Sequence, residues 1–254
     1  MKKLLVAVML VASFIFVFSS ENVLFDNAHA QTAGSAHWTI DTGFSYFADD
    51  VEDAGFRVNS IDYGEIKASL LEQFDILVIP EPNNPFDREE IEDIKDFVKN
   101  GGGLFLISDN KGADRNHNGW DSIKIYNKFV DDFGFKFNER TFSEHPLKGD
   151  RLDCSVMEGV FEVGSWGGTS IEVLDPSKVK GLINVSNSNG GDPFVVVAEY
   201  GKGRIVAVGD SSPFDDGSMS SEKLYANYQM YDHRKMAVNL VDFLAKKNGF
   251  DIFK

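Results

Sequence analysis

Residues 74–109, FDILVIPEPNNPFDREEIEDIKDFVKNGGGLFLISD, contain two continuous apolar runs separated by one amphipathic stretch. The runs at 75–82 and 103–109 predict buried strands, because strands covered on both faces are apolar throughout. The stretch between them predicts a helix that has acidic first turns and ends at Lys99-Asn100-Gly101. Its apolar face is formed by Ile91, Ile94, Phe97 and Val98. This order predicts a parallel βαβ unit.

The alternation of strands and helices continues on both sides of this unit. A first strand is predicted at 22–29, followed by a helix within 39–56 that carries Phe44, Phe47 and Val51. A helix after Asp121 is predicted from the positions of Ile123, Asn127, Val130 and Phe133. Residues 193–212 predict a hairpin around Gly201-Lys202-Gly203, and a last helix carries Met236, Leu240, Val241 and Leu244.

The pattern changes between these parts, because residues at about 135–190 form short β-like pieces separated by Gly and Ser. We therefore predict an α/β fold with a doubly wound, mostly parallel sheet of the flavodoxin-like kind and a β-rich insertion. Residues 21–254 are predicted to form one domain.

The first twenty residues predict a signal peptide, since Lys2 and Lys3 precede an apolar stretch. A cut near Ser19 is favoured over one after Ala30, which would remove the first strand. An uncleaved membrane anchor is the alternative. The protein is accordingly expected to be secreted or extracytoplasmic, in the periplasm or cell envelope, with no membrane insertion beyond this segment.

The composition limits the class of partner. The chain has 40 acidic and 25 basic residues and a formal net charge of −15, so its surface repels phosphates and disfavours nucleic-acid binding. Divalent cations are compatible with this charge. Cys154 is the only cysteine, so no intrachain disulfide can form.

Residues 74–109 resemble the middle of a class I glutamine amidotransferase-like domain, and YGKGRIVAVGDSSPF (200–214) is similar to the late strand of its exported, gliding-motility and intraflagellar-transport (GldG-like, DUF4350-type) branch. The resemblance implies an amidotransferase-like fold. An amidotransferase has a nucleophilic Cys where this chain has Ser108-Asp109-Asn110, which excludes glutamine hydrolysis. Ser108 lacks the G-x-S-x-G turn of a serine nucleophile. Related branches of the fold are non-catalytic modules of larger assemblies.

A second motif, DRNHNGWD (114–121), matches the start of a calcium loop. Side-chain oxygens at alternate positions can converge on one ion while a glycine permits the turn. The predicted Ca²⁺ ligands are Asp114, Asn116, Asn118 and Asp121. The loop is not an EF-hand, because Ile125 occupies the position of the bidentate Glu. The alternative is a solvated turn in which Asp121 caps the next helix.

Acidic side chains also follow the predicted parallel strands, whose carboxyl ends share one edge of the sheet. Such a group could hold a metal ion for hydrolysis, although acids at strand ends are also common turn formers. The candidate catalytic residues are Asp26, His29, Glu81, Asp109 and Asp210. Trp120 and Trp166 could stack on sugar rings or anchor loops. His233, beside Asp232 and Arg234, is expected at the surface.

Two functions follow from these patterns. The first is an exported, non-catalytic module that binds a protein or a carbohydrate ligand and is stabilised by calcium. The alternative is a metal-dependent extracytoplasmic hydrolase that acts on a sugar or ester through the strand-end carboxylates.

Overall fold

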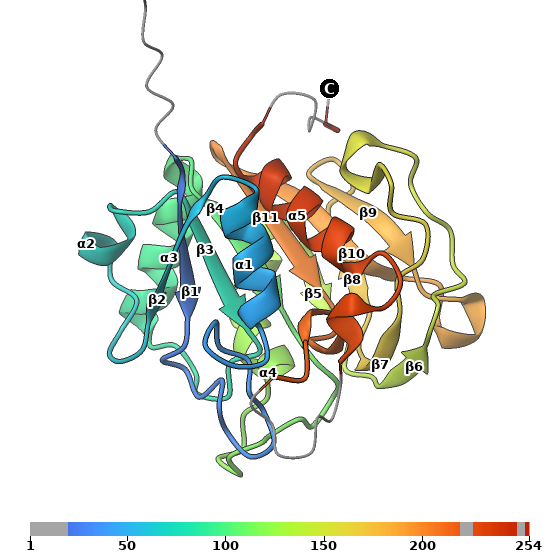
Figure 1. Cartoon of the computed structure of the whole chain (residues 1–254), viewed down its shortest axis with the longest axis horizontal. Helices are drawn as coiled ribbons and strands as arrows, with labels where there is room; N and C mark the ends of the chain where they lie inside the picture. The colour runs from blue at the N-terminus through green and yellow to red at the C-terminus, as the bar shows by residue number, and fades with distance from the viewer. Residues whose placement is uncertain (1–19, 219–225, 248–251, 254) are drawn as a thin grey trace, which may run out of the picture.

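A seven-stranded sheet forms the centre of the computed structural model, which describes residues 20–218, 226–247 and 252–253 (Figure 1). The strands lie in the order β2-β1-β3-β4-β11-β10-β9. Their bounds are β1 (Asn22–Asp26), β2 (Arg57–Ile61), β3 (Ile76–Pro80), β4 (Gly103–Ile107), β9 (Val179–Asn184), β10 (Pro193–Tyr200) and β11 (Gly203–Val208). The first five strands in this order are parallel, and β10 is antiparallel to both neighbours. The predicted signal peptide lies outside the described residues except for residue 20.

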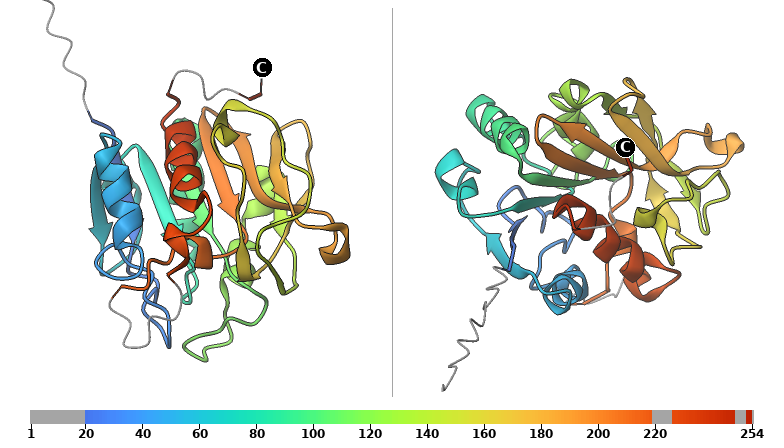
Figure 2. Two further views of the ribbon diagram at one scale, coloured as in Figure 1. Left: turned by 45° about the vertical axis from the view of Figure 1, so that its right-hand side comes forward. Right: turned by 90° about the horizontal axis from the view of Figure 1, so that it is seen from above.

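Helices cover both faces of this sheet (Figure 2). Helices α1 (Ser45–Asp53) and α5 (His233–Leu244) pack on one face, against strand residues such as Phe25 and Phe105. Helices α3 (Arg88–Asn100) and α4 (Ser122–Tyr126) pack on the other face, and the short α2 (Ala68–Leu71) lies beside α3. Successive residues of a strand point to opposite faces, which explains why the central strands β3 and β4, covered on both faces, are apolar throughout. The predicted doubly wound, mostly parallel sheet is confirmed.

Helix α3 forms where its sequence predicts it. The Asp87 side chain accepts the backbone N–H of Glu90, while the Glu90 carboxylate accepts the N–H of Asp87, so that both ends of a capping box are present. Gly101 follows the last turn with a φ of 128°, a conformation that favours glycine. Ile94 and Val98 are buried against the sheet.

Two predicted helices are shorter than their apolar patterns. Helix α1 begins only at Ser45, because Thr39 and Thr42 bond to each other in a turn. The first turn of α1 is instead satisfied from far along the chain, since Asp216 Oδ2 accepts the Ser45 hydroxyl and the Tyr46 N–H, both at 2.8 Å. The helix after Asp121 ends at Tyr126, because the Asn127 side chain turns away and bonds to the backbone N–H and C=O of Phe137.

The β-rich insertion predicted for about 135–190 is present. Strands β5 (Phe135–Phe137) and β8 (Ile171–Val173) form one antiparallel pair, and β6 (Phe142–Glu144) and β7 (Ser165–Gly168) form another. Strand β9 then joins the main sheet at its edge. Within the described residues, no helix is both long and apolar enough to cross a membrane.

The aromatic core under α1 allows a direct test of the packing. The Phe47 ring lies between 5.2 and 6.1 Å from the rings of Phe25, Phe105, Phe214 and Tyr228. We expect Phe47→Ala to lower the free energy of unfolding by about 4 kcal/mol, because it leaves a cavity in a buried cluster. The matched control is Tyr46→Ala on the same helix, whose side chain is 44% exposed, with an expected change within about 0.5 kcal/mol. Similar losses in urea unfolding of the two variants would contradict this packing.

Candidate functional site

The carboxyl ends of β1, β3, β4 and β11 meet at one edge of the sheet, as the parallel order requires. An acidic residue ends or follows each of these strands, and all four carboxylate residues are buried: Asp26, Glu81, Asp109 and Asp210. Buried carboxylates need compensating partners. Their partners divide the edge into two clusters.

The first cluster is centred on Arg115, which lies within the predicted calcium loop but carries no side-chain oxygen that could bind an ion. The Arg115 Nε donates to Glu81 Oε1 at 2.5 Å, and one of its terminal nitrogens donates to Asp109 Oδ2. The Ser211 hydroxyl donates to the second oxygen of Glu81 at 2.7 Å. One guanidinium therefore joins the ends of β3 and β4.

The electrostatics of this cluster are dominated by negative charge. Burial, followed by the charges of Glu81 and Asp210, raises the pKa of Asp109 well above its usual range, although Arg115 opposes the shift. Burial would lower the pKa of Arg115, but Glu81 and Asp109 raise it above its ordinary value. Burial also raises the pKa of Asp215, nearby in the chain after β11, to about 7. Perturbed carboxyl groups grouped in this way are typical of functional sites.

The backbone at Glu81 is strained. Its φ is 29°, in a region that L residues rarely adopt, and Pro82 follows it. Such a conformation persists only where the surroundings hold it. Here the Glu81 N–H donates to Ile107 O, and its carboxylate is held by Arg115 and Ser211.

A pocket of 130 Å³ opens above Arg115 and Asp109. Its aromatic lining consists of Trp38 and Trp166, and its polar lining includes Asn110, Ser211 and Ser212. The Trp38 side chain is nearly buried, at 4% exposure, and its Nε1 has no hydrogen-bond partner among the described residues. The Arg115 guanidinium lies 5.6 Å from the centre of the Trp38 ring.

Asp210 positions the second tryptophan. Its Oδ2 accepts the Ser165 hydroxyl at 2.6 Å and the Trp166 backbone N–H at 2.8 Å. The Trp166 ring stacks on His145, with ring centres 4.9 Å apart and planes at 8°. Asp210 thus connects the end of β11 to β7 rather than facing the pocket as a free carboxylate.

The second cluster contains Asp26 and His29. The His29 Nδ1 lies 2.9 Å from Asp26 Oδ2, and its Nε2 lies 3.1 Å from Glu90 Oε1. Burial alone would lower the pKa of His29, but Asp26 and Glu90 raise it to about 10. Both ring nitrogens therefore carry protons and are occupied, so this imidazolium ties the end of β1 to the first turn of α3.

The five candidate catalytic residues are therefore not in one pocket. Glu81 and Asp109 are joined by Arg115, Asp210 lies near enough to raise the pKa of Asp109, and only Asp109 lines the pocket. Asp26 and His29 belong to the other cluster. In the described part of the chain, no group of three or more His, Cys, Asp or Glu side chains is arranged to hold a metal ion.

The side chains of the predicted calcium ligands form hydrogen bonds within the protein. The two carboxylate oxygens of Asp114 accept the backbone N–H groups of Asn118 and Gly119, at 3.0 and 2.8 Å. Asn116 and Asn118 donate their side-chain N–H groups to Asn83 O. Asp121 Oδ1 accepts the Lys124 N–H, so its predicted role as the cap of α4 is confirmed.

The remaining tryptophan and histidine candidates take up different environments. Trp120 packs at the margin of the core under Lys128, whose Nζ lies 4.1 Å from the ring centre, and does not line the pocket. The prediction that His233 lies at the surface is wrong, because the residue is fully buried. Its Nε2 accepts the Gly164 N–H at 2.9 Å, its Nδ1 donates to Asn227 O at 2.7 Å, and burial lowers its pKa.

The His29 cluster predicts a loss of stability in alkali. The folded protein keeps this proton up to about pH 10, whereas the unfolded chain releases it near pH 6.5. The stabilisation is therefore complete below about pH 6.5 and is lost as the pH rises toward 10. We expect the urea midpoint to fall between about pH 7.5 and about pH 10, above the titration of Asp215. His29→Gln should remove most of this fall, and an unchanged slope in the variant would refute it.

Thermal unfolding of an Asp114 variant can distinguish the two interpretations of the loop at 114–121, a calcium site and a solvated turn. Because Asp114 caps two backbone N–H groups, Asp114→Ala should lower the free energy of unfolding by about 1 kcal/mol with or without calcium. The measurement is thermal unfolding in EDTA and in added Ca²⁺. A rise in the wild-type melting temperature with Ca²⁺ that is absent from Asp114→Ala would instead establish the calcium site, by mass action on the folded state.

Several solved structures share this fold. The mmIFT52 N-terminal domain matches with a TM-score of 0.69 and 14% identity, over 89% of this chain and 98% of that one. The cytoplasmic protein STM1381 from Salmonella typhimurium LT2 matches with a TM-score of 0.59 and 14% identity, over 88% and 99% of the two chains. A putative ThuA-like protein from Bacteroides uniformis has a TM-score of 0.55 and 14% identity, over 90% and 92%. At such identities the likeness shows the fold alone.

A comparison with curated proteins found no match. The likenesses to solved structures do not confirm the amidotransferase-like and GldG-like assignments, which stay predictions. A family model described as a domain of unknown function, DUF4350, matches residues 39–230. Because this match covers more than half of the sequence, the chain belongs to the DUF4350 family.

Proposed function

We propose that this protein is an exported, non-catalytic binding module of amidotransferase-like fold whose pocket holds a neutral, hydroxyl-rich ligand, such as one ring of a carbohydrate. The pocket combines two tryptophans with hydroxyl, amide and carboxyl groups. Apolar walls with a few polar groups that fix orientation are typical of small-ligand sites. A surface charge of −15 also favours a neutral ligand over a phosphorylated one.

The observation that carries the proposal is the indole N–H of Trp38. The residue lines the pocket, is 4% exposed, and has no partner for Nε1 among the described residues. A buried donor without an acceptor costs free energy, and native proteins pair the great majority of such groups. The Trp38 ring would have to turn slightly for Nε1 to reach the pocket, where a hydroxyl oxygen of a bound ligand would supply the acceptor.

The charges around Arg115 narrow the class of ligand. Its guanidinium already bonds to two carboxylates, so it is not free to receive an anion. A cation could approach the acidic groups but offers no acceptor to the Trp38 indole. A hydroxyl group both donates and accepts, so it can satisfy a carboxylate on one side and the indole on the other.

The size and rigidity of the pocket agree with a single ring. Its volume is 130 Å³, close to the roughly 150 Å³ of a cavity that holds benzene. The Trp166 wall is held by the stack on His145 and by the Asp210 bond to its backbone. A wall that is held before the ligand arrives loses little entropy on binding.

The environment of Ser108 supports a non-catalytic role. Ser108, at the position of the amidotransferase Cys, is fully buried, and its hydroxyl lies 3.0 Å from that of Ser122. A buried hydroxyl engaged with another hydroxyl, with no His base among its hydrogen bonds, is not activated for attack.

The proposal predicts a specific loss of affinity. We expect one or more sugars of a panel of glucose, galactose, mannose, xylose and N-acetylglucosamine, as methyl glycosides, to bind in isothermal titration calorimetry. Trp38→Phe keeps an aromatic wall but removes Nε1, so binding should weaken roughly fivefold, the loss of one hydrogen bond. The matched control is Trp120→Phe, which alters the tryptophan outside the pocket and should leave affinity unchanged. Equal effects of the two substitutions would refute the site.

The second candidate function is hydrolysis of a sugar or ester, because a carboxyl with a raised pKa in a pocket can serve as a general acid. This reading would place the proton on Asp109. The same protein should then release nitrophenol from p-nitrophenyl glycosides or esters, with and without added Zn²⁺ or Mg²⁺, and Asp109→Asn should abolish the release. Turnover with that dependence would replace the non-catalytic proposal.

A further inference from the structure

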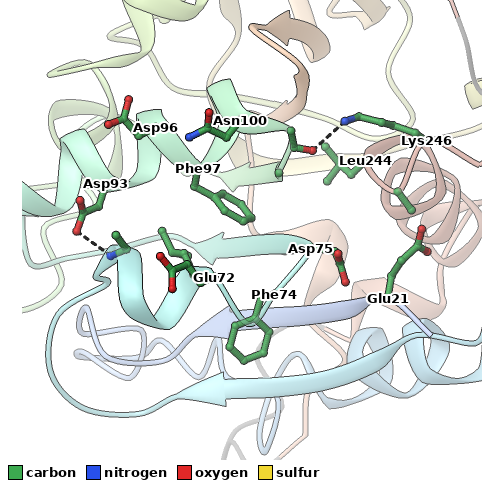
Figure 3. A pocket seen from close by; sticks show the side chains of 15 residues that line it. Glu21, Glu72, Phe74, Asp75, Asp93, Asp96, Phe97, Asn100, Leu244 and Lys246 are labelled. Atoms are coloured by element: carbon green, nitrogen blue, oxygen red, sulfur yellow. Dashed lines mark hydrogen bonds between the residues drawn. The ribbon is translucent and has the colours of Figure 1, made fainter. Parts of the chain in front are cut away.

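A second and larger cavity lies at the opposite edge of the sheet, where β3 and β4 begin (Figure 3). Its volume is 480 Å³, within the range of pockets that hold small molecules or side chains. The residues before β3, the outer face of α3 and the end of α5 contribute to its lining. It shares no lining residue with the pocket above Arg115.

The cavity has an aromatic and aliphatic surface. The Phe97 ring projects from α3 toward the middle of the cavity (Figure 3). It packs on Gly102, where an added Cβ would lie 2.4 Å from the ring. Phe74 and Leu71 line the cavity from the α2 side, and Leu244 from α5. An apolar surface of this kind accommodates the methylene stem of a long side chain.

Five acidic residues also line the cavity. They are Glu21, Glu72, Asp75, Asp93 and Asp96. Asp75 and Asp93 each accept one backbone N–H, from Asn22 and Ala68, at 2.8 Å. A backbone N–H carries no formal charge, so these bonds place no cation beside either carboxylate.

Lys246, the basic residue among the described lining residues, is directed away from the carboxylates. The Lys246 Nζ donates to the carbonyl oxygens of Gly101 and Lys202, at 2.8 and 2.6 Å, rather than to a carboxylate. Burial, with repulsion from Asp75 and Asp242, raises the pKa of Glu21 although Lys247 opposes the shift. The described lining therefore contains five acidic residues and one lysine beside an apolar surface.

We propose that this cavity docks a basic segment of a partner protein, with the stem of a Lys or Arg side chain on Phe97 and its charged head among Glu72, Asp75 and Asp96. The complementarity is both apolar and electrostatic. The methylene stem covers the aromatic face, and the charged head is attracted by the carboxylates. The charge of −15 would steer a basic partner toward this surface. A second copy of this chain is disfavoured, because two acidic surfaces repel.

The test uses a fluorescein-labelled peptide, acetyl-Gly-Leu-Arg-Leu-Lys-Leu-Gly-amide, in fluorescence anisotropy with the purified protein. The variant is Glu72→Gln/Asp96→Asn, which neutralises two exposed side chains. It leaves the hydrogen bonds of Asp75 and Asp93 in place. The matched control is Glu52→Gln/Glu172→Gln, which changes two exposed glutamates outside the cavity and shifts the net charge equally.

We expect the Glu72→Gln/Asp96→Asn variant to bind the peptide about fivefold more weakly and the control to bind as the wild type does. The difference in affinity should be smaller at high salt. A peptide with norleucine in place of Arg and Lys should lose most of its affinity. In amide NMR spectra the peptide should shift the signals of Gly101 and Gly102. Unchanged melting temperatures would show that both variants are folded.

Three outcomes would overturn the proposal. The first is that the peptide does not bind to the wild type. The second is an equal loss of affinity in the Glu72→Gln/Asp96→Asn variant and the control, which would show only a general attraction to an acidic protein. The third is that the wild type self-associates in sedimentation and the Glu72→Gln/Asp96→Asn variant does not, which would assign the cavity to a second copy of this chain. None of these bears on sugar binding, because Trp38 and the other pocket residues are unchanged.

Discussion

The ion pairs of Arg115 with Glu81 and Asp109 hold together the edge of the sheet at which the parallel strands end. Parallel strands that lie side by side bring the residues after them to one edge, so acids placed there meet whether or not their charges are balanced. Buried like charges would repel or take up protons. One guanidinium balances part of this charge, while burial, followed by the charges of Glu81 and Asp210, keeps the pKa of Asp109 raised.

This constraint also shapes the surroundings of the site. The loop that carries Arg115 lies over the strand ends. The Arg115 backbone N–H donates to Asn83 Oδ1, and its guanidinium lies against the Trp38 ring. Asp210 holds Trp166 on the other side, and the pocket lies between the two tryptophans. The imidazolium of His29 performs a separate task at β1, because Asp26 and Glu90 occupy both of its nitrogens. The two clusters share an edge but not a pocket.

Much of the fold could be predicted because its signals are local. The continuous apolar runs at β3 and β4 and the capping box of α3 require only neighbouring residues, and these elements form where they are expected. The start of α1 at Ser45 does not follow from its apolar pattern, because Asp216, far along the chain, supplies the acceptor for its first turn. The buried position of His233 was missed for the same reason, because Gly164 and Asn227 satisfy its ring from outside its helix.

The sequence by itself determined the layers of the protein and the strand ends at which its acids gather, because periodicity and strand order are properties of short segments. Only the tertiary structure decided which acid meets which partner. Arg115 lies in a polar loop whose composition indicates a turn, and nothing local shows that it reaches Glu81 and Asp109. Nothing local in the sequence shows that Trp38 Nε1 lacks a hydrogen-bond partner among the residues that the structure describes. Pairing of side chains far apart in the chain depends on the packing of the whole fold, and that packing is what forms the pocket.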